Sequence, residues 1–256
     1  MKSRVATIAR FTLLEARRTR VPALVLLTVA LLVGASFFVE EITVTEGARF
    51  QAGFYAASAR FAAVFIGAFY VLASIVREFD DKGLDMILAL DLPRSHYVLG
   101  KLAGFLGIAA VLSAAMCVPL LWLAPAQAVL QWGISLTFEL AIVTALALFC
   151  IINFNQLLPA ASFVAAFYLL ARVLTAMRLM SAHPVAGAGS ASHQLISWVV
   201  EGLALMMPAF DTWTQTAWLV NQPASWADVA AIVAQGALYV TLLAAAAIFD
   251  LYRKNF

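Results

Sequence analysis

The chain has 256 residues, of which 64% are hydrophobic and only 12% are charged, and its formal net charge at pH 7 is +2. Soluble domains carry a charge on roughly a quarter of their residues, so this composition excludes a soluble globular protein. Between Leu102 and Ala171 the chain runs for 70 residues with a single charged side chain, Glu139. An apolar run of about 20 residues can cross a bilayer as a helix, and this run is long enough for three crossings. The sequence therefore predicts an all-α integral membrane protein.

The N-terminal residues predict a basic amphipathic helix. Over residues 3–20, side chains such as Ile8 and Thr12 share one face, while most of the arginines lie opposite. Phe11 and Leu14 interrupt the pattern. Such a helix lies along the headgroup surface with its basic side chains near anionic lipid. The alternative is a charge cluster that only orients the first span.

Six apolar stretches can span a bilayer, and no internal repeat or linker divides them. In chain order they are Val21–Val39, Phe54–Val76, about Leu99–Trp122, about Gly133–Ile152, Leu158–Met177 and Val229–Phe249. Ser225 and Asp228 form a predicted capping box at the start of the sixth span. We therefore expect a single transmembrane domain over residues 1–256, in which residues 1–20 form the N-terminal helix.

An even number of spans places both termini on one side of the membrane. Twelve of the 16 basic residues fall on that side: Lys2, Arg4, Arg10, Arg17, Arg18, Arg20, Arg77, Lys82, Arg94, Lys101, Arg253 and Lys254. By the positive-inside rule, this side is predicted to be cytoplasmic. The opposite side holds Glu40, Glu41, Glu46 and a long segment, residues 178–228.

The segment at residues 77–98, between the second and third spans, predicts a cytoplasmic docking element. Leu84, Ile87 and Leu88 recur at helical spacing with acidic residues around them. Pro93 ends this predicted helix, because a proline disfavours the α conformation of the residue before it. Ser95 is then expected to cap the third span. A short helix with an apolar ridge, held between two spans, presents a small surface to which a soluble partner can dock.

These residues also carry a family resemblance. The pattern Arg77-Glu78, Gly83, a leucine-rich turn, Leu92-Pro93-x-Ser95 and Val98-Leu99-Gly100-Lys101 resembles the signature of the type-2 ABC transporter permeases. The layout of a basic N-terminal helix, six spans and a long outer segment before the sixth span is similar as well. The chain has Leu84 where the family pattern has threonine, and His96 where it has arginine.

The resemblance implies that Asp80–Leu92 is a coupling helix in a groove of a separate ATPase subunit, and that residues 1–20 form a cytoplasmic interface helix. It also implies two permease copies, identical or siblings, over two ATPases in the bacterial inner membrane. ATP and Mg²⁺ would then be bound by the partner, with no cofactor on this chain. The residues assigned to ATPase coupling are Arg77, Glu78, Asp80, Asp81, Gly83, Leu84, Asp85, Leu88, Asp91 and Pro93.

The sequence contains no motif that predicts catalysis or metal binding by this chain. It contains no G-x-x-x-x-G-K-[ST] phosphate loop, so we do not expect it to hydrolyse ATP or to be an enzyme. Cys117 and Cys150 lie in apolar runs, and no Cys or His spacing is typical of a metal site. No catalytic residue and no nucleic-acid partner is predicted.

The long outer segment, residues 178–228, contains four of the six tryptophans. Ser192–Met207 is apolar but too short to cross a bilayer, and Pro208 ends it. A second short helix is expected to start at Asp211, a favourable N-cap. In the resembling family, short re-entrant helices at this position close the outer end of the pathway. The alternative is two helices lying flat in the outer interface, with tryptophans as anchors.

Three ionisable residues fall within predicted spans: Arg60, Glu139 and Arg172. Charges at this depth are costly and normally pair or face water. We expect an ion pair between Glu139 and Arg172 that joins the fourth span to the fifth. The alternative is a polar lining for a substrate.

The sequence leaves three functions open. The first is half of an exporter for an amphipathic or lipid-like molecule. The second is a mechanical transducer that passes ATP-driven motion to a periplasmic partner without carrying a substrate. The third is a haem-exporter-like permease, for which the sequence offers no ligand pair. No motif identifies the substrate. No motif shows whether the permease pairs with itself or with a sibling chain.

Overall fold

The computed structural model describes residues 2–43, 46–80, 93–182 and 191–253, and these form helices joined by turns, without a strand among them. Six of the helices are long and apolar enough to cross a membrane. They are α2 (Val21–Ile42), α3 (Gly47–Asp80), α5 (Arg94–Leu123), α6 (Ala126–Phe154), α7 (Leu157–Ala182) and α10 (Trp226–Arg253). The predicted all-helical architecture is confirmed. The six predicted spans coincide with these six helices, each of which extends beyond its predicted span.

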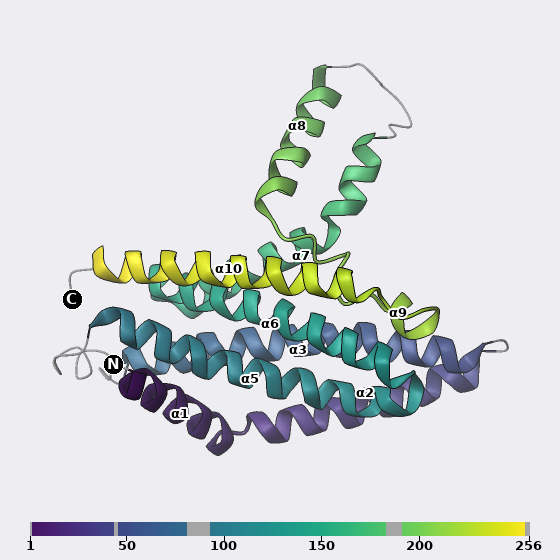
Figure 1. Cartoon of the computed structure of the whole chain (residues 1–256), viewed down its shortest axis with the longest axis horizontal. Helices are drawn as coiled ribbons and strands as arrows, with labels where there is room; N and C mark the ends of the chain where they lie inside the picture. The colour runs from purple at the N-terminus through teal and green to yellow at the C-terminus, as the bar shows by residue number, and fades with distance from the viewer. Residues whose placement is uncertain (1, 44–45, 81–92, 183–190, 254–256) are drawn as a thin grey trace.

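Helix α6 is the centre of the bundle (Figure 1), where it packs against α3, α5, α7 and α10. Of its most apolar stretch, 78% is buried within the chain, against 6% for α2. Glycines allow the close approach of neighbours: a Cβ at Gly133 would lie 2.7 Å from the Cys117 sulfur, and one at Gly236 would lie 2.7 Å from the Phe138 ring. Small residues at helix contacts are the usual means of packing in lipid.

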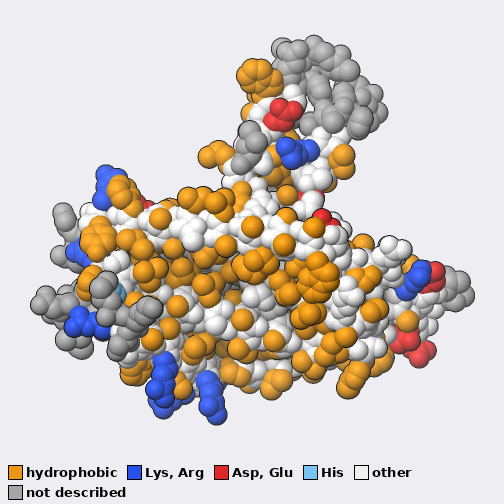
Figure 2. All heavy atoms as spheres, viewed as in Figure 1, with side chains coloured by type: hydrophobic (Ala, Val, Ile, Leu, Met, Phe, Trp, Pro, Cys, Tyr) orange, Lys and Arg blue, Asp and Glu red, His pale blue; other side chains and the backbone are white. Residues whose placement is uncertain are grey.

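Both chain termini lie at the same end of the bundle, which we call the terminal end (Figure 1). Figure 2 shows lysines and arginines gathered at that end and a wide hydrophobic surface along the helices. An even number of crossings requires this arrangement of the termini. The exposed hydrophobic surface is what a bundle surrounded by lipid presents.

The N-terminal helix, α1 (Lys2–Arg18), forms as predicted and packs against α5. The contact depends on two glycines of α5. A Cβ at Gly100 would lie 2.7 Å from the Ile8 Cβ, and one at Gly104 would lie 2.6 Å from the Thr12 Cβ. Thr12 is buried, whereas Phe11, which interrupts the sequence pattern, is 68% exposed. The N-terminal helix therefore packs Ile8 and Thr12 against the glycine face of α5.

We expect Gly104→Ala to destabilise the protein by about 2 kcal/mol, because it overpacks this contact. The measurement is thermal unfolding in detergent, with the protease sensitivity of α1 as a second readout. Gly34→Ala is the matched control, since nothing lies within 4 Å of its added Cβ. Thr12→Gly should recover part of the loss in the Gly104→Ala background. Equal behaviour of the Gly104 and Gly34 variants would contradict the packing argument.

Two predicted helix starts are wrong. Ser95 does not cap α5, because the helix already begins at Arg94 and its N-cap is Pro93, which makes no side-chain cap bond. Asp211 does not start the second short helix. That helix, α9 (Ala217–Val220), begins after Thr216. The residues around Asp211 instead form turns that bond to buried side chains of the bundle.

The cap of the sixth span is confirmed on its serine side, where Ser225 Oγ accepts a hydrogen bond from the Ala227 N–H at 3.1 Å. The short apolar helix before Pro208 also forms, as α8 (Ala191–Met206). With the end of α7, against which it packs, α8 stands out from the bundle (Figure 1). Trp198 is 79% exposed on it.

Candidate functional site

Two polar clusters lie on elements that the sequence singles out. The first joins the two ends of the family-like motif and consists of Glu78, Tyr97 and Lys101; we call it the motif clasp. The Lys101 ammonium lies 2.8 Å from Glu78 Oε2, and the Tyr97 hydroxyl donates to the same oxygen at 2.9 Å. The side chains of Lys101 and Glu78 are only 8% and 15% exposed. The clasp therefore ties the last turn of α3 to the first turns of α5.

Helix α1 takes part in the same network through Glu15. Its Oε2 lies 3.9 Å from the Lys101 ammonium, and its Oε1 accepts a hydrogen bond from Ser74 at 3.1 Å. One lysine thus sits between two carboxylates from two different helices. Charge pairs shielded from water are held more firmly than exposed ones. The arrangement fixes α1, α3 and α5 relative to one another.

The predicted coupling residues fall into three groups: those at exposed helix ends, the one in the motif clasp, and those outside the described residues. Arg77, Asp80 and Pro93 are exposed at the ends of the described helices, and Glu78 is in the motif clasp. The predicted coupling helix over Asp80–Leu92 lies, apart from Asp80, outside the described residues. So do the other predicted coupling residues, Asp81, Gly83, Leu84, Asp85, Leu88 and Asp91.

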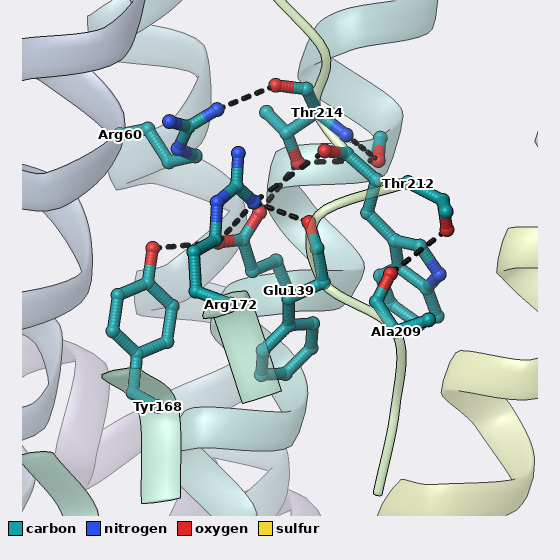
Figure 3. Close-up of polar contacts among 10 residues, drawn as sticks. Arg60, Glu139, Tyr168, Arg172, Ala209, Thr212 and Thr214 are labelled. Carbon is teal, nitrogen blue, oxygen red and sulfur yellow. Dashed lines mark hydrogen bonds and ion pairs between the residues drawn. The ribbon is translucent and has the colours of Figure 1, made fainter. Parts of the chain in front are cut away.

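The second cluster surrounds Glu139, which is fully buried on α6 (Figure 3). Arg172 of α7 places its Nη1 atom 3.6 Å from Glu139 Oε1, so the predicted ion pair is present. The Tyr168 hydroxyl donates to the same oxygen at 2.8 Å. The Thr214 hydroxyl donates to Glu139 Oε2 at 2.5 Å. One carboxylate therefore receives three partners from two separate parts of the chain.

Arg60, the third predicted intramembrane residue, does not reach the carboxylate and instead donates to the Thr214 carbonyl at 2.7 Å. Arg172 similarly donates to the backbone carbonyls of Phe210 and Trp213. Two guanidinium groups thus hold the chain between α8 and α9 against the bundle. Together with Glu139 they leave one net positive charge in the cluster.

Thr214 has a positive φ of 48°, a left-handed conformation that costs a non-glycine residue about 1–2 kcal/mol. Its N–H donates to Ser135 Oγ at 2.9 Å. With the hydroxyl on Glu139 and the carbonyl on Arg60, all three polar groups of this residue are bonded to buried side chains. The bundle therefore determines the conformation of this turn.

Sequence reasoning missed Ser135, Tyr168 and Thr214 in this cluster. For the first two a signal exists: Ser135 and Tyr168 each precede a predicted ionisable residue by four positions, so each shares a helix face with it. No local signal marks Thr214, because its turn depends on contacts from three helices.

Neither a protein-family model nor a curated protein matches this chain. Among the described residues, no group of three or more His, Cys, Asp or Glu side chains could hold a metal ion. The assignment to a family therefore stays a prediction from the motif.

Proposed function

We propose that this chain is the membrane-spanning permease subunit of an ABC transporter, which couples ATP hydrolysis on a separate ATPase subunit to export of a substrate. The observation that carries the proposal is the motif clasp. A segment that transmits motion must be held firmly where it joins the spans, and Glu78 and Lys101 join both ends of residues 81–92 at 2.8 Å.

Forces applied to this segment would reach most of the bundle. Its flanking helices, α3 and α5, both pack against the central α6. At the start of α5, Arg94 donates to the Leu251 carbonyl of α10 at 2.7 Å. Because packed helices move as rigid bodies, a push on the segment is passed to spans at both ends of the sequence.

The proposal includes a cytoplasmic ATPase that binds ATP and Mg²⁺, a second permease copy, and the bacterial inner membrane with both termini in the cytoplasm. The gathering of basic side chains at the terminal end supports this orientation (Figure 2). In this setting α1 is the cytoplasmic interface helix, and residues 81–92 contain the coupling helix.

A second candidate function is a mechanical transducer that passes ATP-driven motion to a periplasmic partner. The observation that favours it is the exposed apolar surface of α8 and the end of α7, which stand out sideways from the bundle (Figure 1). Trp198, Met206 and Met180 are each more than 70% exposed there. The same pair of helices could instead close the outer end of a transport pathway as re-entrant or interfacial elements.

The first test is replacement of Asp85, Leu88 and Asp91 by alanine in the tagged chain, purified with its ATPase and returned to lipid. We expect the complex to assemble but its ATPase turnover to fall about tenfold, equivalent to losing about 1.4 kcal/mol of coupling. Glu40→Ala with Glu41→Ala removes the same number of acidic charges at the opposite end and should leave turnover unchanged.

Two results would count against the proposal. Unchanged turnover in the triple variant removes the coupling role of the segment. Failure of any ATPase to co-purify with the wild-type chain removes the ABC assignment itself. If turnover does respond, transport assays in the same vesicles separate the exporter from the transducer.

A further inference from the structure

A groove of about 730 Å³ lies where α1 bends into α2, against α3. Three arginines line it: Arg18 and Arg20 from the bend, and Arg77 from the last turn of α3. Its other walls are mostly apolar and include Leu24, Phe65 and Phe69.

The groove changes from charged to apolar along its length. On α3, the lining residues Arg77, Ala73, Phe69 and Phe65 recur every four positions and therefore share one face. At 1.5 Å per residue, Arg77 and Phe65 are separated by about 18 Å along the helix axis. On α2, Arg20 is likewise followed one turn later by Leu24. A cationic mouth at the terminal end thus leads to an apolar floor at the depth of the spans.

Among the described residues, none of the three arginines has an ion-pair partner. Within residues 2–43, 46–80, 93–182 and 191–253, the ion pairs involve Arg49, Arg172 and Lys101, and none involves an arginine of the groove. All three are exposed. Guanidinium groups gathered in this way are suited to bind a phosphate group.

We propose that this groove binds one anionic phospholipid from the surrounding leaflet. Its phosphate would lie among Arg18, Arg20 and Arg77, and an acyl chain would lie along Leu24, Phe69 and Phe65. A free anion would leave the apolar walls unused, whereas an acyl chain covers them. Leu24 and Phe69 are about half exposed, so the groove is open to lipid from the side.

A neighbouring apolar groove of about 450 Å³ adds room for the second acyl chain. It shares Val21, Ile66 and Tyr70 with the first groove. Its further walls come mainly from α1, α2 and α5, including Leu13, Val25 and Val111. The lipid would therefore straddle the start of α2 and stabilise the bend between α1 and α2.

The test uses the purified full chain and two probes with identical acyl chains, dioleoyl phosphatidylglycerol and dioleoyl phosphatidylcholine. We expect the phosphatidylglycerol to stay bound in native mass spectrometry and to raise the thermal midpoint in detergent, and the phosphatidylcholine to do neither. Arg18→Gln with Arg20→Gln should weaken phosphatidylglycerol binding about 25-fold, at about fivefold per arginine near anionic lipid. The charge-matched control, Arg10→Gln with Arg253→Gln, changes two exposed arginines outside the groove and should leave binding within twofold of the wild type.

A second variant tests the apolar part of the groove. Phe69→Gln keeps all three arginines and should still weaken binding of the phosphatidylglycerol. Each variant is first shown to unfold at the wild-type midpoint in phosphatidylcholine, so that loss of binding is not loss of fold.

Three results would overturn the proposal. An equal loss of binding in the control pair would mean general attraction of anionic lipid to a basic surface. Equal binding of the two lipids would remove the role of charge. Displacement of the lipid by millimolar inorganic phosphate, or no effect of Phe69→Gln, would mean a site for a free anion.

Discussion

Replacing Glu139 by leucine is expected to lower the free energy of unfolding by about 4 kcal/mol, because removing one partner of a buried ion pair leaves the other charge uncompensated. The Arg172 side chain is 13% exposed and Glu139 is fully buried. The substitution also removes the acceptor of the Tyr168 and Thr214 hydroxyls. Reversible unfolding of the purified chain in mixed micelles measures the loss.

A double-mutant cycle separates the ion pair from the general cost of changing the core. Arg172→Met alone should also be destabilising. The double variant should lose at least about 1 kcal/mol less than the sum of the two single losses, since contacting residues couple. Glu46→Leu is the matched control: its ion pair with Arg49 is more than half exposed on both sides, so its loss should stay within about 0.5 kcal/mol. Simple additivity in the cycle would remove the pairing argument.

Breaking the motif clasp has the second-largest expected effect. Lys101→Met should cost about 3 kcal/mol, because it leaves the carboxylates of Glu78 and Glu15 near each other without their shared cation. If residues 81–92 couple to an ATPase as proposed, turnover of the complex should fall with it. Unfolding and ATPase turnover are measured on the same preparation.

The charge-reversed pair, Glu78→Lys with Lys101→Glu, is the informative rescue. It restores an ion pair across the same two helices, so both stability and turnover should recover in part. Recovery of stability without turnover would mean that the clasp supports the fold only. No recovery of either would mean that the 2.8 Å contact is not the source of the effect.

The parts of the fold that could be predicted are those fixed by local chemistry. The near absence of charge over Leu102–Ala171, where Glu139 is the single charged residue, predicts spans directly, since an unpaired charge in lipid is costly. The Glu139–Arg172 pair was predictable for the same reason: few charges are present at that depth, and each needs a partner. The overlap of predicted spans and helices follows from these two constraints.

The parts that could not be predicted depend on contacts distant in sequence. Asp211 has the chemistry of an N-cap, yet the chain around it is held in turns. Arg60 and Arg172 donate to its backbone carbonyls, and Glu139 accepts from the Thr214 hydroxyl. Ser95 is a good cap by propensity, but Pro93 already fixes an extended residue before the helix. At Asp211 tertiary bonding outweighs a local preference of about 1 kcal/mol, and at Ser95 the fixed backbone of the neighbouring Pro93 does so.

The small burial of α2 makes this helix dependent on the thickness of its surroundings. Its 22 residues span about 33 Å, close to the hydrocarbon thickness of about 30 Å, whereas the 34 residues of α3 span about 51 Å. A thinner bilayer favours tilting of a span that exceeds it, and α2, with 6% of its apolar stretch buried, is held mainly by its contact with α3. Because α1 continues directly into α2, such a tilt would pull on α1, so bilayer thickness acts mechanically on the basic end of this protein.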